Sequence, residues 1–520
     1  MATYNSVGAY SSTAAYPAFY GLMQYGDGNG TDPRFAVEAV NAETPAGALQ
    51  PLGEPALLQG ADLPAPIETL ALLHRRWYAD PQQRDLLVAS SAGKLYARVA
   101  NGGSWTALEM PAGITAFQGN DWSWVTYEIN PEGSEAPVDV LLLSNAIDGM
   151  FMLRGDNLTL TAVETPKKFG VIERYAERIW GGAIIGDPDM LVYSAPYDPT
   201  DWKAQTEIPE DGAGDLLQPS WDGDSFTALR AFGSQLIAFK KTRVWRILGT
   251  DPGEYVFKEQ YGGGMPYANT IVVDAERIFA MTDRGVVIYD GSSVAAFQQQ
   301  SAEDVFARMN RASLDKACAC MWRDRYFCAI PLDGATECNA VLVYNSVDGT
   351  WLLHDAISVS AFLPTEDALY FTSPTSPSSV FLWNEDSWAS GEPSKAVTRW
   401  VTPWNDLGCK NVTKGAFELY LLPEVQDRPV VLRISLQTEK WTKTRFLRVT
   451  PASWKGVAWP DDLMSGWGGP LHSSEKQFAP RRLRFNGSAR RFRIIIESEE
   501  NSAPWRIVGG MALSMESDAD

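Results

Sequence analysis

A short strand that ends in a large aromatic or apolar residue recurs along most of this chain. One copy reads GVVIYDG and has Tyr289 as its anchor, and the other anchors are Tyr96, Met152, Tyr193, Trp245, Tyr344 and Trp383. Successive anchors lie 39 to 56 residues apart, with a mean of about 48. A period of roughly 40–50 residues with several strands in each repeat is typical of β-propeller blades. We count about seven units, and a ring of six or eight blades would also satisfy the spacing.

Each unit consists of four short strands separated by turn residues. In the fifth unit these strands are TIVVDA, RIFAMT, GVVIYDG and VAAFQ. The two middle strands are almost wholly apolar, as expected where neighbouring blades cover both faces of a sheet. Tyr289 stands where other units carry Met or Trp, so we interpret it as a packing residue and not as a catalytic phenol.

The sixth unit contains two predicted turns. NSVDGTWLL (345–353) resembles the Asp-box turn of sialidase-type propellers, with one residue less on each side of its Gly, and we interpret it as a β-turn between two strands. CACMWRDRYFC (318–328) predicts a hairpin that turns at Asp324 and sets Cys320 opposite Cys328. The spacing of these cysteines and Cys338 matches no zinc pattern. We therefore expect packed thiols and no metal site.

The repeat is confined to the middle of the chain. Residues 1–64 are rich in Gly, Ala, Pro and Tyr and show no sustained period, which predicts an extended N-terminal arm. Residues 65–403 carry the propeller repeats. After Trp404 the strands become longer and alternate polar with apolar residues, as in RPVVLRISLQT and ARRFRIIIES, so residues 404–520 are predicted to form a β-sandwich. The predicted fold class is all-β, a propeller followed by a C-terminal sandwich.

Charge is distributed unevenly between these parts. The 520 residues carry a formal net charge of −20. From Trp404 to Asp520 there are 17 Lys+Arg and 14 Asp+Glu, whereas the preceding residues hold 27 and 50. Such an acidic body repels phosphate groups, which argues against broad nucleic-acid binding. It is compatible with DNA that passes without specific binding.

Few residues indicate catalysis. The only histidines are His74, His354 and His472, and they lie in different segments. The chain has no G-x-S-x-G motif, Walker A loop or Rossmann glycine fingerprint. We therefore predict a non-enzymatic protein without catalytic residues or cofactors. No apolar run approaches the ~20 residues of a membrane helix, and MATYNSVGAYSS does not read as a secretory signal, so we expect synthesis in the cytoplasm and no membrane insertion.

Three stretches resemble virion proteins of tailed bacteriophages. VNAETPAGALQPLGEPALL (40–58) resembles their N-terminal segment, and LIAFKKTRVWRILG, YGGGMPYANTIVV and DRGVVIYDG are similar to their propeller core. FNGSARRFRIIIESEENSAPWRIVGGMALSME resembles the sandwich strands that close many of them. The family includes tail nozzle, packaged-DNA stabilisation and tail-tip proteins. The resemblance covers most of the chain and brings no catalytic residues.

This resemblance implies a structural component of a phage tail. Such a protein would be made in the host cytoplasm, enter the virion tail with other tail or head–tail joining proteins, and help to form or close the DNA passage. It would act as a homo-oligomeric ring. Aromatic residues of the N-terminal arm would suit docking on a neighbouring subunit, and the predicted interface residues are Tyr4, Tyr10, Tyr16, Phe19 and Tyr20.

Two alternatives of other classes remain open. One is a receptor-binding or carbohydrate-binding propeller module of a phage tail, in which loop aromatics stack on sugar faces. Its candidate residues are Trp122, Trp124, Trp202 and Trp221. The other is a glycoside hydrolase, which needs two facing carboxyl groups, one with its pKa raised by burial. Paired acids such as Asp187/Asp189 occur in loops, where solvated side chains are the usual interpretation.

Overall fold

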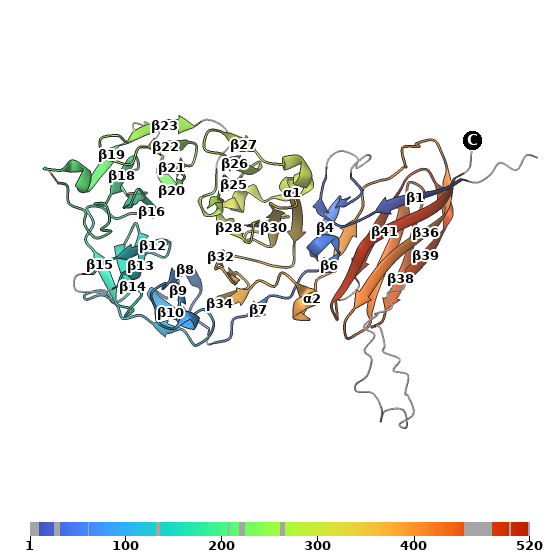
Figure 1. Ribbon diagram of the computed structural model, residues 1–520, viewed down its shortest axis with the longest axis horizontal. Coiled ribbons are helices and arrows are strands. Elements are labelled where there is room, and N and C mark those ends of the chain that lie inside the picture. Colours follow the sequence, from blue (N-terminus) through green and yellow to red (C-terminus); the bar gives the residue numbers. More distant parts are fainter. Residues whose placement is uncertain are drawn as a thin grey trace, which may run out of the picture.

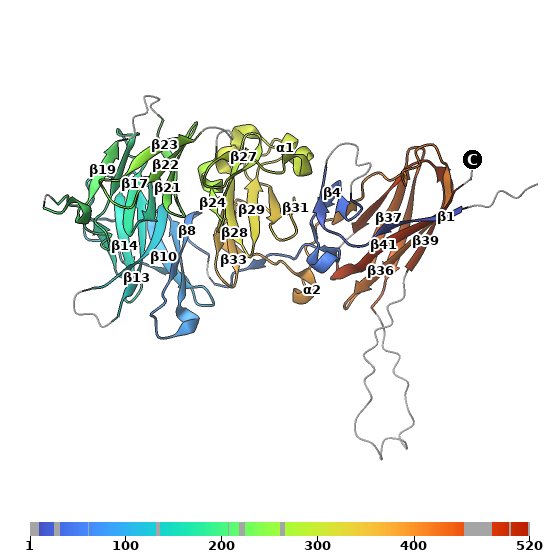
Figure 2. The same ribbon diagram turned by 45° about the horizontal axis from the view of Figure 1, so that its top comes forward.

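Seven antiparallel blades of four strands form a closed ring, and a β-sandwich lies beside it (Figure 1). Six blades are separate sheets, and the strands of the remaining blade belong to a larger sheet that continues into the sandwich. This arrangement is seen in a computed structural model that describes residues 10–24, 32–60, 62–131, 136–205, 207–217, 224–260, 266–451, 481–498 and 501–517. The ring is a β-propeller, so the predicted fold class is confirmed and its blade number is seven. Figure 2 shows the same two parts from a view turned by 45°.

The first four blades follow one another along the chain, each a meander of four strands. Blade 1 contains β8 (Ile67–His74), β9 (Asp85–Ser91), β10 (Lys94–Val99) and β11 (Thr106–Ala107). Blade 2 contains β12 (Ser123–Ile129), β13 (Val138–Asn145), β14 (Gly149–Arg154) and β15 (Leu160–Val163). Blade 3 contains β16 (Val171–Tyr175), β17 (Arg178–Gly182), β18 (Met190–Tyr193) and β19 (Gly214–Leu217). Blade 4 contains β20 (Phe226–Phe232), β21 (Gln235–Lys240), β22 (Val244–Leu248) and β23 (Val256–Gln260).

The remaining blades close the ring. Blade 5 contains β24 (Val272–Val273), β25 (Ile278–Thr282), β26 (Gly285–Tyr289) and β27 (Val294–Ala296). Blade 6 contains β28 (Cys318–Trp322), β29 (Arg325–Ile330), β30 (Ala340–Asn345) and β31 (Thr350–His354). Blade 7 has only three consecutive strands, which are β32 (Ala361–Pro364), β33 (Leu369–Ser373) and β34 (Ser376–Leu382). Its fourth strand is β7 (Ala56–Leu57), which comes from the N-terminal segment.

The repeated anchors occupy one structural position. Six of them lie on the third strand of their blade, and Trp383 directly follows the third strand of blade 7. Tyr289 is 3% exposed, in agreement with a packing role. Apolar clusters fill the spaces between consecutive blades; for example, Val140 of blade 2 and Ile179 of blade 3 belong to one cluster. Because each face of a blade is covered by its neighbour, a ring of blades buries what a single sheet would expose.

The sandwich contains two sheets of long strands. One has the order β1-β41-β36-β39 and the other contains β40, β37 and β38. Their bounds are β1 (Tyr10–Tyr16), β36 (Lys414–Val425), β37 (Val430–Thr438), β38 (Thr442–Val449), β39 (Arg481–Ala489), β40 (Phe492–Ser498) and β41 (Trp505–Ser517). The strand β35 (Arg399–Val401) pairs with β40, so the second sheet begins slightly before Trp404.

The N-terminal segment has no core of its own and runs along both domains. Besides β1 and β7 it forms β2 (Gly21–Leu22), β3 (Phe35–Ala36), β4 (Glu38–Val40), β5 (Ala42–Glu43) and β6 (Gln50–Pro51). In Figure 1, β4 and β6, drawn in blue, lie between the ring and the sandwich, whereas β1 lies on the sandwich. The segment is therefore extended, as predicted, but it pairs within its own chain.

In the part of the chain that the structure describes, helices are few and short. They are α1 (Glu303–Arg308), α2 (Ser387–Ser390) and the 3-10 turns at Pro45–Gly47, Pro81–Gln83, Pro209–Asp211, Ala268–Thr270, Gln299–Ala302 and Arg311–Lys316. Within the described ranges, no helix is long and apolar enough to cross a membrane.

Both predicted turns of blade 6 are present, but one register differs from the prediction. Asn345 pairs with Thr350 across the turn between β30 and β31. The hairpin of β28 and β29 turns at Arg323 and Asp324, which both have positive φ. Cys328 faces Ala319 and not Cys320, because the tight turn pairs Trp322 with Arg325 and shifts the register by one residue.

Candidate functional site

Blade 6 and the sandwich share one continuous sheet, which we call the junction. Its strand order is β31-β4-β35-β40 where it passes from ring to sandwich. On the propeller side, Leu353 of β31 pairs with Val40 of β4, and the Asn41 N–H donates to the Leu353 carbonyl at 2.8 Å. On the sandwich side, β4 pairs along its whole length with β35. Three residues of β4 therefore connect two domains that are distant in sequence.

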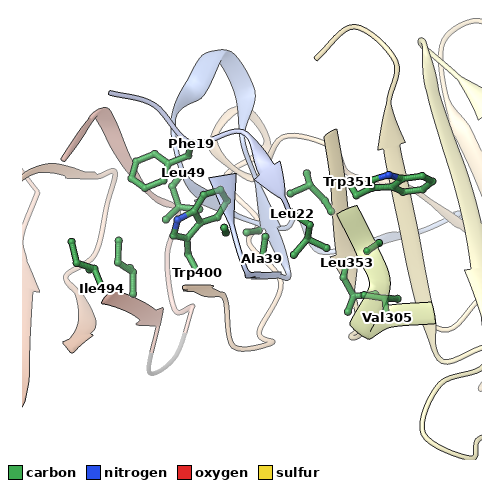
Figure 3. Close-up of a cluster of buried hydrophobic side chains, with 14 of the residues drawn as sticks. Phe19, Leu22, Ala39, Leu49, Val305, Trp351, Leu353, Trp400 and Ile494 are labelled. Carbon is green, nitrogen blue, oxygen red and sulfur yellow. The ribbon is translucent and has the colours of Figure 1, made fainter. Parts of the chain in front are cut away.

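Apolar side chains fill the junction (Figure 3). Trp351 and Leu353 extend from blade 6, Leu22 and Ala39 from the N-terminal segment, and Trp400 from β35, each 2% exposed or less. They belong to one hydrophobic cluster that also contains the sandwich core. At roughly 25 cal/mol for each Å² of apolar surface removed from water, such burial is the main force holding the domains together.

A buried charged group lies at the propeller side of the junction. Glu43 is 1% exposed, and its carboxylate lies 3.1 Å from Arg325 Nη1 and 3.2 Å from His354 Nε2. Burial alone would raise the pKa of Glu43, but Arg325 and His354 outweigh that effect and hold it below its ordinary value. Because a buried charge is costly when its partner is removed, this group fixes the N-terminal segment against blade 6.

A second ion-pair group crosses the junction near its surface. Arg399 of β35 pairs with Glu497 of β40 and donates from Nε to Glu38 of β4 at 2.6 Å. The guanidinium thus bridges three adjacent strands. Since it is 32% exposed, solvent screens part of this attraction.

The predicted interface aromatics lie partly inside the protein. Tyr16 and Phe19 are 2% and 1% exposed, and Phe19 packs edge-to-face on Trp400 at 5.3 Å between ring centroids. For these two residues the prediction of an intersubunit contact is wrong, because their apolar surface is already used within the chain. Tyr20 is half-buried, with Arg34 4.7 Å above its ring. Tyr10 belongs to β1, but its side chain, like the whole of Tyr4, lies outside the described residues.

The propeller channel contains a second candidate site, which we call the axial pocket. The first strand of each blade lines the channel, and the pocket lies where β12, β16 and β20 begin. Its volume is about 440 Å³. Charged and polar lining residues include Asp121, Ser123, Glu173, Arg230 and Asn269.

Glu173 is the unusual ionisable group of this pocket. Its carboxylate lies 3.9 Å from Arg230 Nη1, and its side chain keeps 21% exposure. Burial raises its pKa to about 7, although the charge of Arg230 acts in the opposite direction. Sequence reasoning missed both residues. The sequence signal that could have identified them is a charged residue within the first strand of a blade, because that strand lines the channel.

The four predicted stacking tryptophans do not form one site. Trp122 and Trp124 both line the axial pocket. Trp122 is only 5% exposed and packs edge-to-face on Phe117, so its faces are not free. Trp202 packs on Phe169 and donates from Nε1 to the Pro199 carbonyl at 3.0 Å, which makes it a core residue. Trp221 lies outside the described residues.

The cysteines of blade 6 are buried thiols. Cys318, Cys320, Cys328 and Cys338 are at most 6% exposed, and burial raises the pKa of each, that of Cys328 to about 12. Such thiols are protonated and unreactive at neutral pH. Among the described residues, no group of three or more His, Cys, Asp or Glu side chains could hold a metal ion.

Comparisons with protein families and with curated proteins give no match. Among solved structures, the WD40 domain of Neurospora crassa Pan2 is 13% identical with a TM-score of 0.36, over 64% of this chain and 90% of that one. Dihydro-heme d1 dehydrogenase NirN is 12% identical with a TM-score of 0.38, over 84% of this chain and 80% of that one. Likeness this distant carries no inference about function.

Proposed function

We propose that this protein is a non-enzymatic structural component of a bacteriophage tail, of the nozzle or a related tail-tube or tail-tip type. The observation that carries the proposal is the junction, where one sheet and one hydrophobic cluster join propeller and sandwich. A part that must keep its shape under load needs domains that do not move against each other. An interface as apolar as this one favours fixed domains over the mobile arrangement usual between domains.

Charge and sequence resemblance support the same proposal. The acidic residues before Trp404 would let DNA pass through a nearby channel without adhesion. The resemblance of the N-terminal, propeller and C-terminal stretches to tailed-phage virion proteins covers most of the chain. Partners in this proposal are other tail or head–tail joining proteins and further copies of the chain in a ring. Since Tyr16 and Phe19 are buried, the contacts between subunits would involve other residues.

The test is the location of the protein in purified phage particles. Mass spectrometry of the particles should detect the chain at several copies per virion, and cryo-electron microscopy should place the propeller and sandwich in the tail with unchanged relative orientation. A second preparation from a phage with an early stop codon in this gene should lack that density. Absence of the chain from particles, together with a purely monomeric protein in solution, would contradict the proposal.

The alternative, a receptor-binding or carbohydrate-binding module, is favoured by a different observation. Trp124 and the Glu173–Arg230 pair line one pocket of the propeller, away from the junction. A structural tail protein could also carry such a pocket.

A further inference from the structure

The axial pocket brings together groups of opposite hydrogen-bonding character. Glu173 comes from β16 of blade 3 and Arg230 from β20 of blade 4. Their 3.9 Å separation is longer than a hydrogen bond, so the two groups face each other without a direct bond. The surrounding wall adds Ser123 and Thr227 from neighbouring strands.

Arg230 is held rigidly and still has donors available. Its Nε donates to the Ile271 carbonyl at 3.1 Å and its Nη1 to the Leu229 carbonyl at 2.8 Å. None of the described residues accepts a hydrogen bond from Nη2. A guanidinium has five N–H donors, and a carboxylate can accept about four hydrogen bonds, so both groups of the pair can bind a further molecule.

Trp124 supplies the apolar part of the same wall. Trp124 is half-buried and packs against the clusters between blades 7, 1 and 2. Trp122, two residues before Trp124, is buried, and its indole Nε1 has no hydrogen-bond partner among the described residues. A concave pocket with an aromatic surface and a few convergent polar groups is the usual form of a small-molecule site.

We propose that the axial pocket binds a saccharide. A hydroxyl group both donates and accepts, so two neighbouring hydroxyls of a sugar can donate to Glu173 and accept from Arg230 at once. The C–H face of the ring would then lie on Trp124, an aromatic with a large apolar surface. Glu173 and Asp121 would repel an anion, and Arg230 would repel a cation. An uncharged polyhydroxylated ligand therefore matches the pair best.

This proposal belongs with the alternative function and does not depend on a structural role in a virion. The pocket lies in blades 2 to 4, whereas the junction involves blade 6 and the sandwich. Loss of sugar binding therefore leaves the structural proposal intact, and absence from virions leaves the pocket intact. The two proposals fail in different experiments.

The experiment uses the full-length protein and saturation-transfer NMR with four probes at millimolar concentration: methyl glucoside, methyl galactoside, methyl mannoside and N-acetylglucosamine. A glycan array extends the search to oligosaccharides. At least one sugar should bind saturably. Glu173→Gln, which keeps the side-chain shape, should weaken that binding about tenfold or more, the usual effect of losing one charge-assisted contact. Trp124→Phe should also weaken it, because the smaller ring offers less apolar surface to the sugar.

Trp77→Ala is the matched control, because Trp77 is 56% exposed and is not part of the pocket. This variant should bind like the parent, and unchanged melting temperatures should show that all three variants are folded. No saturable binding to any probe or array glycan would overturn the proposal. So would binding that survives both pocket substitutions.

Discussion

The outermost strands of blades 6 and 3 occupy equivalent places in the ring but have opposite surroundings. All five residues of β31, TWLLH, are buried. In β19, GDLL, burial alternates and Leu217 is 68% exposed. The outer edge of β31 is covered by Leu22 and Val40 of the N-terminal segment, whereas β19 ends its sheet.

This difference shows that blade 6 is the blade to which the sandwich is attached. Five of the blades end in an outer strand that meets solvent, and blade 7 ends in the short strand β7, whose two residues are exposed. Only in blade 6, among the described strands, does the sheet continue into another domain. Apolar burial therefore holds the sandwich. At β7 both strand residues are exposed, and backbone hydrogen bonds such as that from the Leu58 N–H to the Val380 carbonyl join the segment to blade 7.

The largest effect is expected at Trp351, in the buried outer strand. Trp351→Ala should lower the free energy of unfolding by about 3–5 kcal/mol, because it leaves a cavity between blade 6 and the N-terminal segment. Urea denaturation measures the loss, and limited proteolysis should release the sandwich. Trp77→Ala, the same substitution at an exposed site, should lower the free energy of unfolding only slightly. Equal costs at both sites would remove the distinction between buried and exposed strands.

The buried carboxylate beside β31 should come next. Glu43→Gln should destabilise the protein by about 3 kcal/mol at pH 7, since it leaves Arg325 without its buried partner.

The pH dependence has a defined sign. The folded pKa of Glu43 is below its ordinary value of 4.5, so its stabilising contribution is present above pH 4.5 and is lost as the pH falls through the folded pKa. The parent protein should therefore lose more stability than Glu43→Gln on acidification below pH 4.5. Parallel curves of melting temperature against pH would show that Glu43 does not stabilise the junction.

Ring closure at β7 should be more sensitive to the backbone than to side chains. The Leu58 N–H donates to the Val380 carbonyl at 2.9 Å. Leu58→Pro removes this donor and should cost about 1–3 kcal/mol, with faster hydrogen exchange in β34. Leu57→Ala should have a small effect because Leu57 is 51% exposed. The opposite order of the two variants would mean that apolar contacts, and not the backbone, close the ring.

The smallest effect is expected on β19. Leu217→Ser should change the free energy of unfolding by less than about 0.5 kcal/mol, because the side chain is already in solvent. A clear loss of particle incorporation by a stable Leu217→Ser protein would identify β19 as an intersubunit contact.

Much of the propeller could be predicted from the chain alone. The anchors from Tyr96 to Trp383 share the third strand because each blade repeats the same local requirement, an apolar strand between two neighbours. The apolar sequence of TWLLH already differed from the mixed outer strands of other units, and this was the available signal that β31 is covered. The axial pocket was less predictable, since Glu173 and Arg230 are 57 positions apart and meet only when the ring closes.

The N-terminal segment shows which contacts the local sequence pattern could not predict. Its aromatics predicted contacts outside the chain, yet Tyr16 and Phe19 pack inside it. Short strands such as β4 and β7 carry no sustained period, and a strand edge accepts any compatible backbone, so the sequence does not name the partner strand. Local periodicity by itself determined the blades and the sandwich strands. Only the tertiary structure decided that β4 joins the two domains and β7 closes the ring, because these pairings depend on which strand edges the folded domains leave open.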